Sequence, residues 1–518
     1  MSTCRYGDGT LYGAAGVTYG AAVVTDRPVT WMFEVDWDGD GVFNGENEGK
    51  YMYALQTETG RQWLLNGSGD GLEPVMTGTG SVEMMNESGR FNPFNLDGPL
   101  AGMLLPGRQF RLRVQRESDG LRQDVMAGRI QDIRPLYAEV DRVKISFVNA
   151  VEELKKRTVR TTVQSAIRYD AAIVMCLDDI GWTDGRDIDT TVSEVMEYWW
   201  GSGRNAMDEI QSIADAALGM FCIGEDGGAV YKSRVSNDVP LMTITGDDIQ
   251  NSYGVKTPMP WESVRNRIRV YARKRTAQTG ITLWETQDRV KISAGGEQEV
   301  WAEFALNGEE AVATSITNPV DGTDYEANSQ EDGLGTDLSA NIAITLSKFA
   351  TTAKLTIRNN GGTDAYLVPP SGSFSLRLRG DAITADKYTF VERADNDSIE
   401  VFGDRPLTVK SDWLQDINTA RDEADILRSR LAAQRQFPRF ALKDEFDLQF
   451  GAKLFGLVLV DFERSGVTGE YRFGYIKHRW TNRLGWQTET EIYLEPNLLG
   501  NVSGTWVFPA VFGVTTVF

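Results

Sequence analysis

Residues 29–148 consist mainly of short runs in which apolar and polar side chains alternate. The runs 110–114, FRLRV, and 143–147, VKISF, place an apolar side chain at every second position. Turns rich in glycine, such as residues 66–71, separate the runs. Because neighbouring side chains of a strand point to opposite faces, this alternation predicts strands with one buried face. The segment is therefore predicted to form an antiparallel sheet, as a barrel or a sandwich.

Helical spacing replaces the alternation further along the chain. Residues 163–181 and 205–218 repeat apolar side chains in steps of three and four, and Gly219 follows the second run as a stop signal. The block 276–380 is rich in Thr, Ala, Gly and Asn, and it contains the alternating run 353–357, AKLTI. That composition predicts a small β-sandwich inserted between larger domains.

The clearest helix is predicted between Ser411 and Pro438. Ser411 is a suitable N-cap, and Pro438 cannot continue a helix. Apolar side chains recur every 3.5 residues, which marks a narrow seam. The seam packs either on its own domain or on another helix, and the sequence leaves both open. Residues 439–496 return to the strand pattern. The seam consists of Trp413, Ile417, Ala420, Ala424, Leu427 and Leu431.

These patterns predict a mainly β, multi-domain protein with α+β parts. A chain of 518 residues exceeds the length of one ordinary core. The predicted divisions are an N-terminal arm (1–28), a β-barrel (29–150), a helical or α+β domain (151–240), returning strands (241–275), an inserted β-sandwich (276–380), a second strand-rich domain with the long helix (381–497) and an apolar C-terminal tail (498–518).

The charge of the chain restricts its partners. The formal net charge is −21, which repels nucleic acid and anionic membranes, so we expect any DNA contact to be fleeting. Cys4, Cys176 and Cys222 are widely spaced, which favours buried free thiols over disulfides or a zinc site. Neither a signal peptide nor an apolar run of membrane-spanning length is evident, so we expect a cytoplasmic protein unless a larger assembly carries it out.

The residues that catalysis needs are few. His478 is the single histidine, so multi-histidine metal centres are excluded, and its strand-like context favours a structural role. The segment 45–50 resembles a phosphate-binding loop, but its glycines are too close and Tyr51 replaces the required hydroxyl residue. Paired carboxylates are too common among 74 acidic residues to indicate glycoside hydrolysis. We therefore expect no enzyme.

One local motif predicts a metal site. Asp36, Asp38 and Asp40 alternate ahead of Gly41, and Asn44 offers a further oxygen. Carboxylate and amide oxygens at this spacing match the start of a calcium loop, and the glycine allows the sharp turn. The twelfth position lacks the bidentate glutamate and the flanks are strand-like, so this is no EF-hand. The alternatives are a structural Ca²⁺ site and an acidic turn that needs no ion.

Several short stretches, in a fixed order along the chain, resemble the hub proteins of bacteriophage tail tips. This family includes the baseplate hubs of contractile tails and the hubs of gene transfer agents. The stretches are 34–41 (EVDWDGDG), 88–95 (SGRFNPFN), 98–100 (GPL), 105–108 (LPGR), 128–130 (GRI), 199–201 (WWG), 213–216 (IADA), 261–266 (WESVRN), 397–399 (DSI) with 402–403 (FG), the long helix and His478.

The resemblance implies a structural role in the virion tail after assembly in the host cytoplasm. It implies barrels like the tail-tube subunit in residues 29–150 and after residue 385, joined by small helical and β domains. It also implies a homotrimeric ring that closes the tube, adapts sixfold to threefold symmetry and frames the channel for genome ejection. The implied partners are the tail tube or distal tail protein and a tail fibre, spike or tape-measure protein, while DNA passes without specific binding.

Two other functions stay open at this point. A distal tail or receptor-binding protein would share the tail location, although such proteins more often show repeats or a single tube-like domain. A secreted carbohydrate-active enzyme would account for the thirteen tryptophans, but it would need an export signal. The Tyr/Gly-rich arm and the apolar tail after Asn497 are expected to contact neighbouring proteins, because these segments cannot bury their apolar side chains by themselves.

Overall fold

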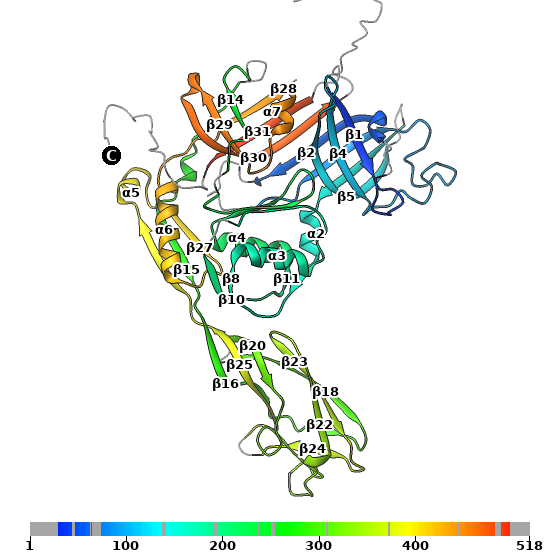
Figure 1. Cartoon of the computed structure of the whole chain (residues 1–518), viewed down its shortest axis with the longest axis vertical. Coiled ribbons are helices and arrows are strands. Elements are labelled where there is room, and N and C mark those ends of the chain that lie inside the picture. The colour runs from blue at the N-terminus through cyan, green and yellow to red at the C-terminus, as the bar shows by residue number, and fades with distance from the viewer. Residues whose placement is uncertain are drawn as a thin grey trace, which may run out of the picture.

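A computed structural model of the protein shows a wide upper body and a lower lobe that extends from it (Figure 1). Strands dominate the described chain, so the prediction of a mainly β, multi-domain protein is confirmed. The arm 1–28 and the tail 498–518 lie outside the described residues. The structure describes residues 29–43, 47–62, 64, 74–136, 141–190, 194–236, 238–249, 254–306, 309–370, 373–443, 445–481 and 488–497.

The first half of the upper body is a curled antiparallel sheet with the strand order β1-β4-β5-β6-β3-β2. Its alternation is as predicted, because Phe110, Leu112 and Val114 of one strand are buried while their neighbours are not. Burial of such side chains is the main stabilising contribution to a sheet of this kind. The strands are β1 (Val29–Val35), β2 (Met52–Gly60), β3 (Thr79–Met85), β4 (Gln109–Arg116), β5 (Arg122–Leu136) and β6 (Arg142–Asn149).

The second half continues the same sheet. Its long strand β30 pairs antiparallel with β2, so that Ala54 opposes Thr481 and Gly60 opposes Tyr475. The strands of both halves therefore belong to one hydrogen-bonded sheet of eleven strands. The elements of this half are β14 (Met242–Thr245), β28 (Arg439–Lys443), α7 (Phe446–Gly451), β29 (Leu457–Phe462), β30 (Val467–Thr481) and β31 (Thr488–Pro496).

A helical layer lies beneath this sheet (Figure 1). The helix predicted at 205–218 is present as α4, and Gly219 donates its backbone N–H to the Ala214 carbonyl as the helix ends. The helix predicted at 163–181 starts late, because residues 164–168 pair with β10 as a strand. The layer contains α2 (Val151–Lys156), β7 (Thr158–Arg160), β8 (Gln164–Arg168), α3 (Tyr169–Asp179), β9 (Arg186–Ile188), β10 (Val195–Trp199), β11 (Ser202–Asn205), α4 (Ala206–Ala216), β12 (Met220–Ile223) and β13 (Ala229–Lys232).

The predicted long helix is shorter at its start than expected. Asp416, not Ser411, is the N-cap and accepts the Thr419 N–H, whereas the Ser411 hydroxyl donates to the Ser212 carbonyl. Trp413 therefore lies outside the helix and is buried in the helical layer. The seam packs on β15 and β26, which settles the partner of this helix. The elements are β15 (Arg267–Ala272), β26 (Thr389–Ala394), α5 (Asn396–Phe402), β27 (Pro406–Lys410) and α6 (Ile417–Leu431).

The lower lobe is inserted between β15 and β26 and has its own apolar core. Leu283, Leu355 and Leu378 are fully buried in it, as the alternating pattern of this block predicts. Its strands are β16 (Arg275–Thr286), β17 (Lys291–Ile292), β18 (Glu297–Glu303), β19 (Ala305–Leu306), β20 (Glu309–Thr317), β21 (Glu326–Asn328), β22 (Ile342–Lys348), β23 (Thr352–Asn359), β24 (Ala365–Val368) and β25 (Leu376–Ala385).

The absence of a side chain at Gly60 allows the two halves of the sheet to meet. Gly60 ends β2 with a φ of +135°, and a Cβ there would lie 2.4 Å from the Gly474 carbonyl oxygen. The next residue, Arg61, donates its backbone N–H to that same oxygen at 2.8 Å. A side chain at position 60 would therefore separate the two backbones and adopt a φ that L-residues avoid.

We predict that Gly60→Ala lowers the free energy of unfolding by about 2–4 kcal/mol, through backbone strain and overpacking. Gly246→Ala is the matched control, because a Cβ at Gly246 meets nothing within 4 Å. Urea unfolding followed by circular dichroism measures both variants. Equal losses in the two variants would contradict a close contact at Gly60.

Candidate functional site

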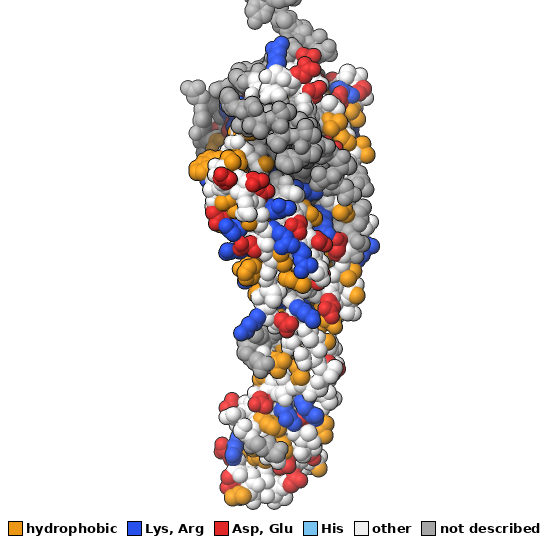
Figure 2. Space-filling model, turned by 90° about the vertical axis from the view of Figure 1, so that its left-hand side faces the viewer, with side chains coloured by type: hydrophobic (Ala, Val, Ile, Leu, Met, Phe, Trp, Pro, Cys, Tyr) orange, Lys and Arg blue, Asp and Glu red, His pale blue; other side chains and the backbone are white. Residues whose placement is uncertain are grey.

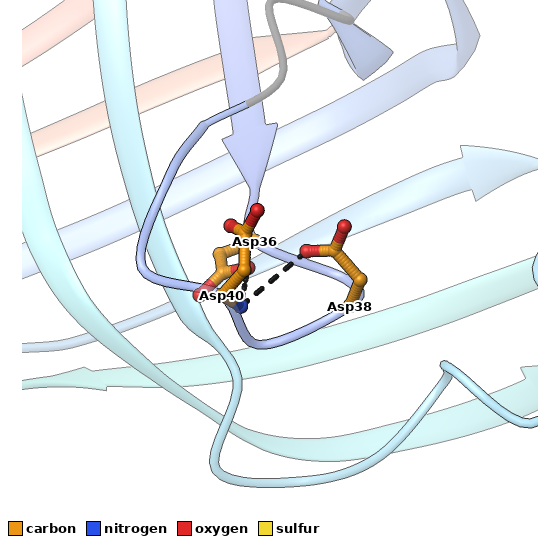
Figure 3. A group of neighbouring side chains, drawn as sticks. All are labelled: Asp36, Asp38 and Asp40. Atoms are coloured by element: carbon orange, nitrogen blue, oxygen red, sulfur yellow. Dashed lines mark hydrogen bonds between the residues drawn. The ribbon is translucent and has the colours of Figure 1, made fainter.

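The acidic loop follows directly from β1. The strand ends at Val35, and the Asp36 N–H still pairs with the Gln109 carbonyl at 3.0 Å, so the sheet holds the start of the loop. Oxygens of Asp36, Asp38 and Asp40 lie within 4.8 Å of one another, as Figure 3 shows. Oxygens around one Ca²⁺ ion, each 2.3–2.6 Å from it, have about this spacing. The structure thus brings the three predicted carboxylates together, while Asn44 lies outside the described residues.

The same carboxylates also hold the turn through backbone hydrogen bonds. Asp36 Oδ1 accepts the N–H groups of Gly39 and Asp40 at 2.8 and 3.1 Å, and its Oδ2 accepts that of Gly41 at 3.0 Å. Asp40 Oδ1 accepts the Val42 N–H at 2.7 Å. These N–H dipoles offset part of the negative charge without an ion. Calcium binding therefore stays a prediction.

A guanidinium also lies against this loop. A Cβ at Gly39 would lie 1.9 Å from Nη1 of Arg108, so the absence of a side chain at Gly39 makes room for that cation. Arg108 is held from the other side, because its Nε donates to the Met103 carbonyl at 3.3 Å. The charge of Arg108 reduces the negative potential that a cation would meet, which predicts weak Ca²⁺ binding.

We predict one Ca²⁺ per chain with a Kd of about 10⁻⁴–10⁻³ M, the range of extracellular calcium modules. Asp38→Asn/Asp40→Asn should abolish binding and leave the turn in place, because Asp36 still accepts the N–H groups of Gly39, Asp40 and Gly41 and an asparagine oxygen at position 40 can still accept that of Val42. Isothermal titration with CaCl₂ measures both proteins. If the wild type gives no heat at about 10 mM Ca²⁺, or if the double variant binds equally, the loop needs no ion.

His478 is buried within the joined sheet. Its Nδ1 lies 2.9 Å from the Thr490 hydroxyl, and its ring stacks on Phe450 at 5.3 Å between centroids. Burial, with a smaller contribution from Lys453, lowers the pKa of His478 to about 3. A neutral imidazole packed between strands supports the structural role expected from the sequence, because it lies away from solvent.

A buried glutamate lies in the helical layer, whose tryptophans also contact the segment before α6. Glu209 Oε1 accepts the Trp199 indole N–H at 3.0 Å, and Trp413 packs edge-on against Trp200 at 5.2 Å. Burial raises the pKa of Glu209 to about 7, although the hydrogen bond from Trp199 and the nearby Arg204 act in the opposite direction. No sequence pattern indicated this carboxyl, because it lies beside the apolar face of its helix rather than on it.

We predict that the stabilising contribution of protonated Glu209 is complete below pH 4.5 and lost as pH rises through 7, since the folded state holds a proton that the unfolded state releases. The unfolding free energy of Glu209→Gln, relative to wild type, should therefore change by about 3 kcal/mol between pH 4 and 8. Glu87→Gln, at an exposed position, controls for net charge. If the difference in unfolding free energy between Glu209→Gln and wild type does not vary with pH, the raised pKa of Glu209 is contradicted.

The joint between the sheet halves also contains buried charges. Glu58 of β2 accepts the Tyr475 hydroxyl at 3.1 Å and lies 3.3 Å from Lys477 Nζ. Arg61 Nε lies 3.6 Å from Glu495 Oε2, and both side chains are almost fully buried. Burial raises the pKa of Glu495, against the effect of Arg61 and other arginines. The Arg61–Glu495 pair makes the joint specific, because separating it would leave two charges buried without partners, whereas Glu58 is about one-third exposed.

Comparison with known proteins found similar chains among solved structures only. No family model and no curated protein matches it. Among solved structures it is similar to the 43 kDa tail protein of prophage MuSo2 from Shewanella oneidensis (12% identity, 90% of this chain and 98% of that one, TM-score 0.46). It is also similar to the tail protein from Neisseria meningitidis MC58 (8% identity, 90% of this chain and 96% of that one, TM-score 0.46). A third similar structure is the prophage tail protein gp18 from Listeria monocytogenes EGD-e (9% identity, 90% of this chain and 94% of that one, TM-score 0.38).

Proposed function

We propose that the chain is a structural hub protein of a phage tail tip, and that three copies form a ring closing the distal end of the tail tube. The observation that carries the proposal is the pairing of β2 with β30, which joins two curled sheet halves within one chain. A chain with two such halves presents six in a threefold ring. This arrangement adapts a sixfold tube to a threefold tip, because symmetric closure repeats each contact around the axis.

An exposed but well-ordered loop supports assembly with neighbours. Phe94 and Leu96, between β3 and β4, are 80% and 82% exposed. The Asn92 side chain accepts the Phe94 N–H at 3.1 Å, and the Asn95 amide donates to the Gly89 carbonyl at 3.1 Å. A loop that its own hydrogen bonds hold in place while it displays apolar side chains has the character of a contact surface.

The charge of the chain supports a channel that DNA passes without specific binding. The net charge is −21, which opposes tight contact with phosphates. On the face shown in Figure 2, however, acidic and basic side chains are interspersed. We infer that repulsion acts from the summed charge of the ring rather than from a wholly acidic face.

A ring at the end of the tail tube has two faces, and each face contacts a different partner. We infer contacts with the tail tube or distal tail protein on one side and with a fibre, spike or tape-measure protein on the other. Along the residues that the structure describes, none of the helices combines the length and apolarity to span a membrane. The role is mechanical rather than enzymatic, and the burial of the neutral His478 supports it, because a general base must reach its substrate.

We predict that the purified chain assembles into threefold rings, measured by light scattering and averaged electron micrographs. Phe94→Ser/Leu96→Ser should shift the mass toward the monomer, because the displayed loop loses its apolar contacts. Leu334→Ser, at an equally exposed position in the lower lobe (83%), is the matched control and should assemble as wild type. A monomeric wild type, or equal behaviour of the loop and control variants, would contradict the proposal.

A further inference from the structure

An aromatic pair lies on the outer face of a three-stranded sheet in the lower lobe, formed by β18, β23 and β22 (Figure 1). Trp301 of β18 is 57% exposed, and Phe349 in the turn between β22 and β23 is 51% exposed. The two rings are near-parallel, with centroids 6.0 Å apart and planes inclined by 18°. The Phe349 N–H donates to the Thr352 carbonyl at 2.9 Å, which fixes the turn. The stacked pair therefore presents an apolar surface to solvent, with about half of each side chain exposed.

Strand alternation explains why the rings point outward. Ala302, Ala353 and Leu355 on the inner face are buried in the core of the lobe. Trp301 occupies the opposite face of β18 and is paired with Lys354 of β23. Because side chains alternate across a strand, the outer positions form one continuous surface around the rings. That surface is polar and comprises Glu297, Glu299, Glu303, Thr345, Ser347, Lys354, Thr356 and Arg358.

The charges of this face point to an uncharged ligand. Lys354 Nζ lies 2.5 Å from Glu299 Oε1, so these opposite charges compensate each other beside the rings. Arg358 of β23 lies opposite Glu297 of β18, whereas Glu303 adds a further negative charge. The face therefore has no excess of positive charge for a nucleic acid or an anionic membrane. The core of a protein–protein interface is usually depleted of charged residues, whereas charged and hydroxyl side chains surround these rings closely.

We propose that this face, defined by Trp301, Phe349 and the Lys354–Glu299 pair, binds an uncharged oligosaccharide of at least two pyranose rings. The C–H-rich face of a pyranose packs on the aromatic rings, and its hydroxyls exchange hydrogen bonds with the carboxylate, ammonium and hydroxyl groups around them. Glu299 accepts from sugar hydroxyls, Lys354 donates to them, and neither group has to change its charge. This inference goes beyond the proposed ring and does not depend on it.

The test measures binding of cellohexaose, maltohexaose and chitohexaose to the full-length chain by calorimetry and tryptophan fluorescence. At least one of the three should bind with a Kd of about 1 mM or below. Trp301→Ala should weaken that binding by at least about tenfold, and Phe349→Ala should weaken it by a smaller factor, because tryptophan contributes the larger stacking area.

The matched control is Trp261→Ala. Trp261 is similarly exposed, at 53%, but its ring lies under the Arg405 guanidinium at 3.7 Å, away from this face. Binding should be unchanged in this variant, and both tryptophan variants should unfold at the wild-type temperature. The proposal is overturned if none of the three oligosaccharides binds at about 10 mM, or if Trp301→Ala behaves as Trp261→Ala does. If no oligosaccharide binds, a change of self-association in Trp301→Ala would identify the face as a protein contact instead.

Discussion

The pairing of β2 with β30 is the contact on which the upper body depends. It joins strands more than 400 residues apart in the chain. It requires a glycine at position 60, because a side chain there would meet the Gly474 carbonyl. Closing so long a loop costs conformational entropy, but that cost grows only slowly with length. Once closed, the backbone hydrogen bonds and buried charge pairs of the joint hold the two sheet halves in one register.

The other parts of the structure reinforce this joint from both sides. Helix α7 of the second half places Phe450 against Trp31 of the first half at 5.5 Å between ring centroids. From below, the Leu454 N–H donates to Glu225 Oε1 at 2.8 Å, which connects the second half to the helical layer. The lower lobe, in contrast, is an insertion with its own core, so it can carry a separate surface without disturbing the joint.

The sequence predicted the elements that local periodicity specifies and missed those that depend on distant partners. Alternation located the strands around Phe110 and Val143, and the spacing of Ala420, Ala424 and Leu427 located α6. The predicted start of α6 was wrong because the Ser411 hydroxyl, although suited to capping a helix, donates to the Ser212 carbonyl of the helical layer. The union of the two sheet halves was not predicted, since alternation marks which face of a strand is buried but not which edges pair.

The sequence also predicted the candidate site only in part, namely the features that depend on local spacing. Three aspartates within five residues at a strand end must lie close together, so their clustering followed from spacing alone. Backbone N–H groups and the Arg108 guanidinium offset part of the negative charge of these aspartates. No local pattern indicates them, because the N–H groups are oriented by the folded turn and Arg108 belongs to a loop 70 residues away. The sequence does not indicate the buried Glu209 for a related reason, because its burial depends on tryptophans of other segments.

Native-state hydrogen exchange at the joint tests the central claim, that the two sheet halves form one cooperative unit. The amides of β2 and of the C-terminal part of β30 should open with the same free energy as those of β4, which lies inside the first half. Such agreement would mean that the joint breaks only when the whole upper body unfolds. If the joint amides open at a free energy lower by about 2 kcal/mol or more while β4 stays protected, the halves are separate units and the account is wrong.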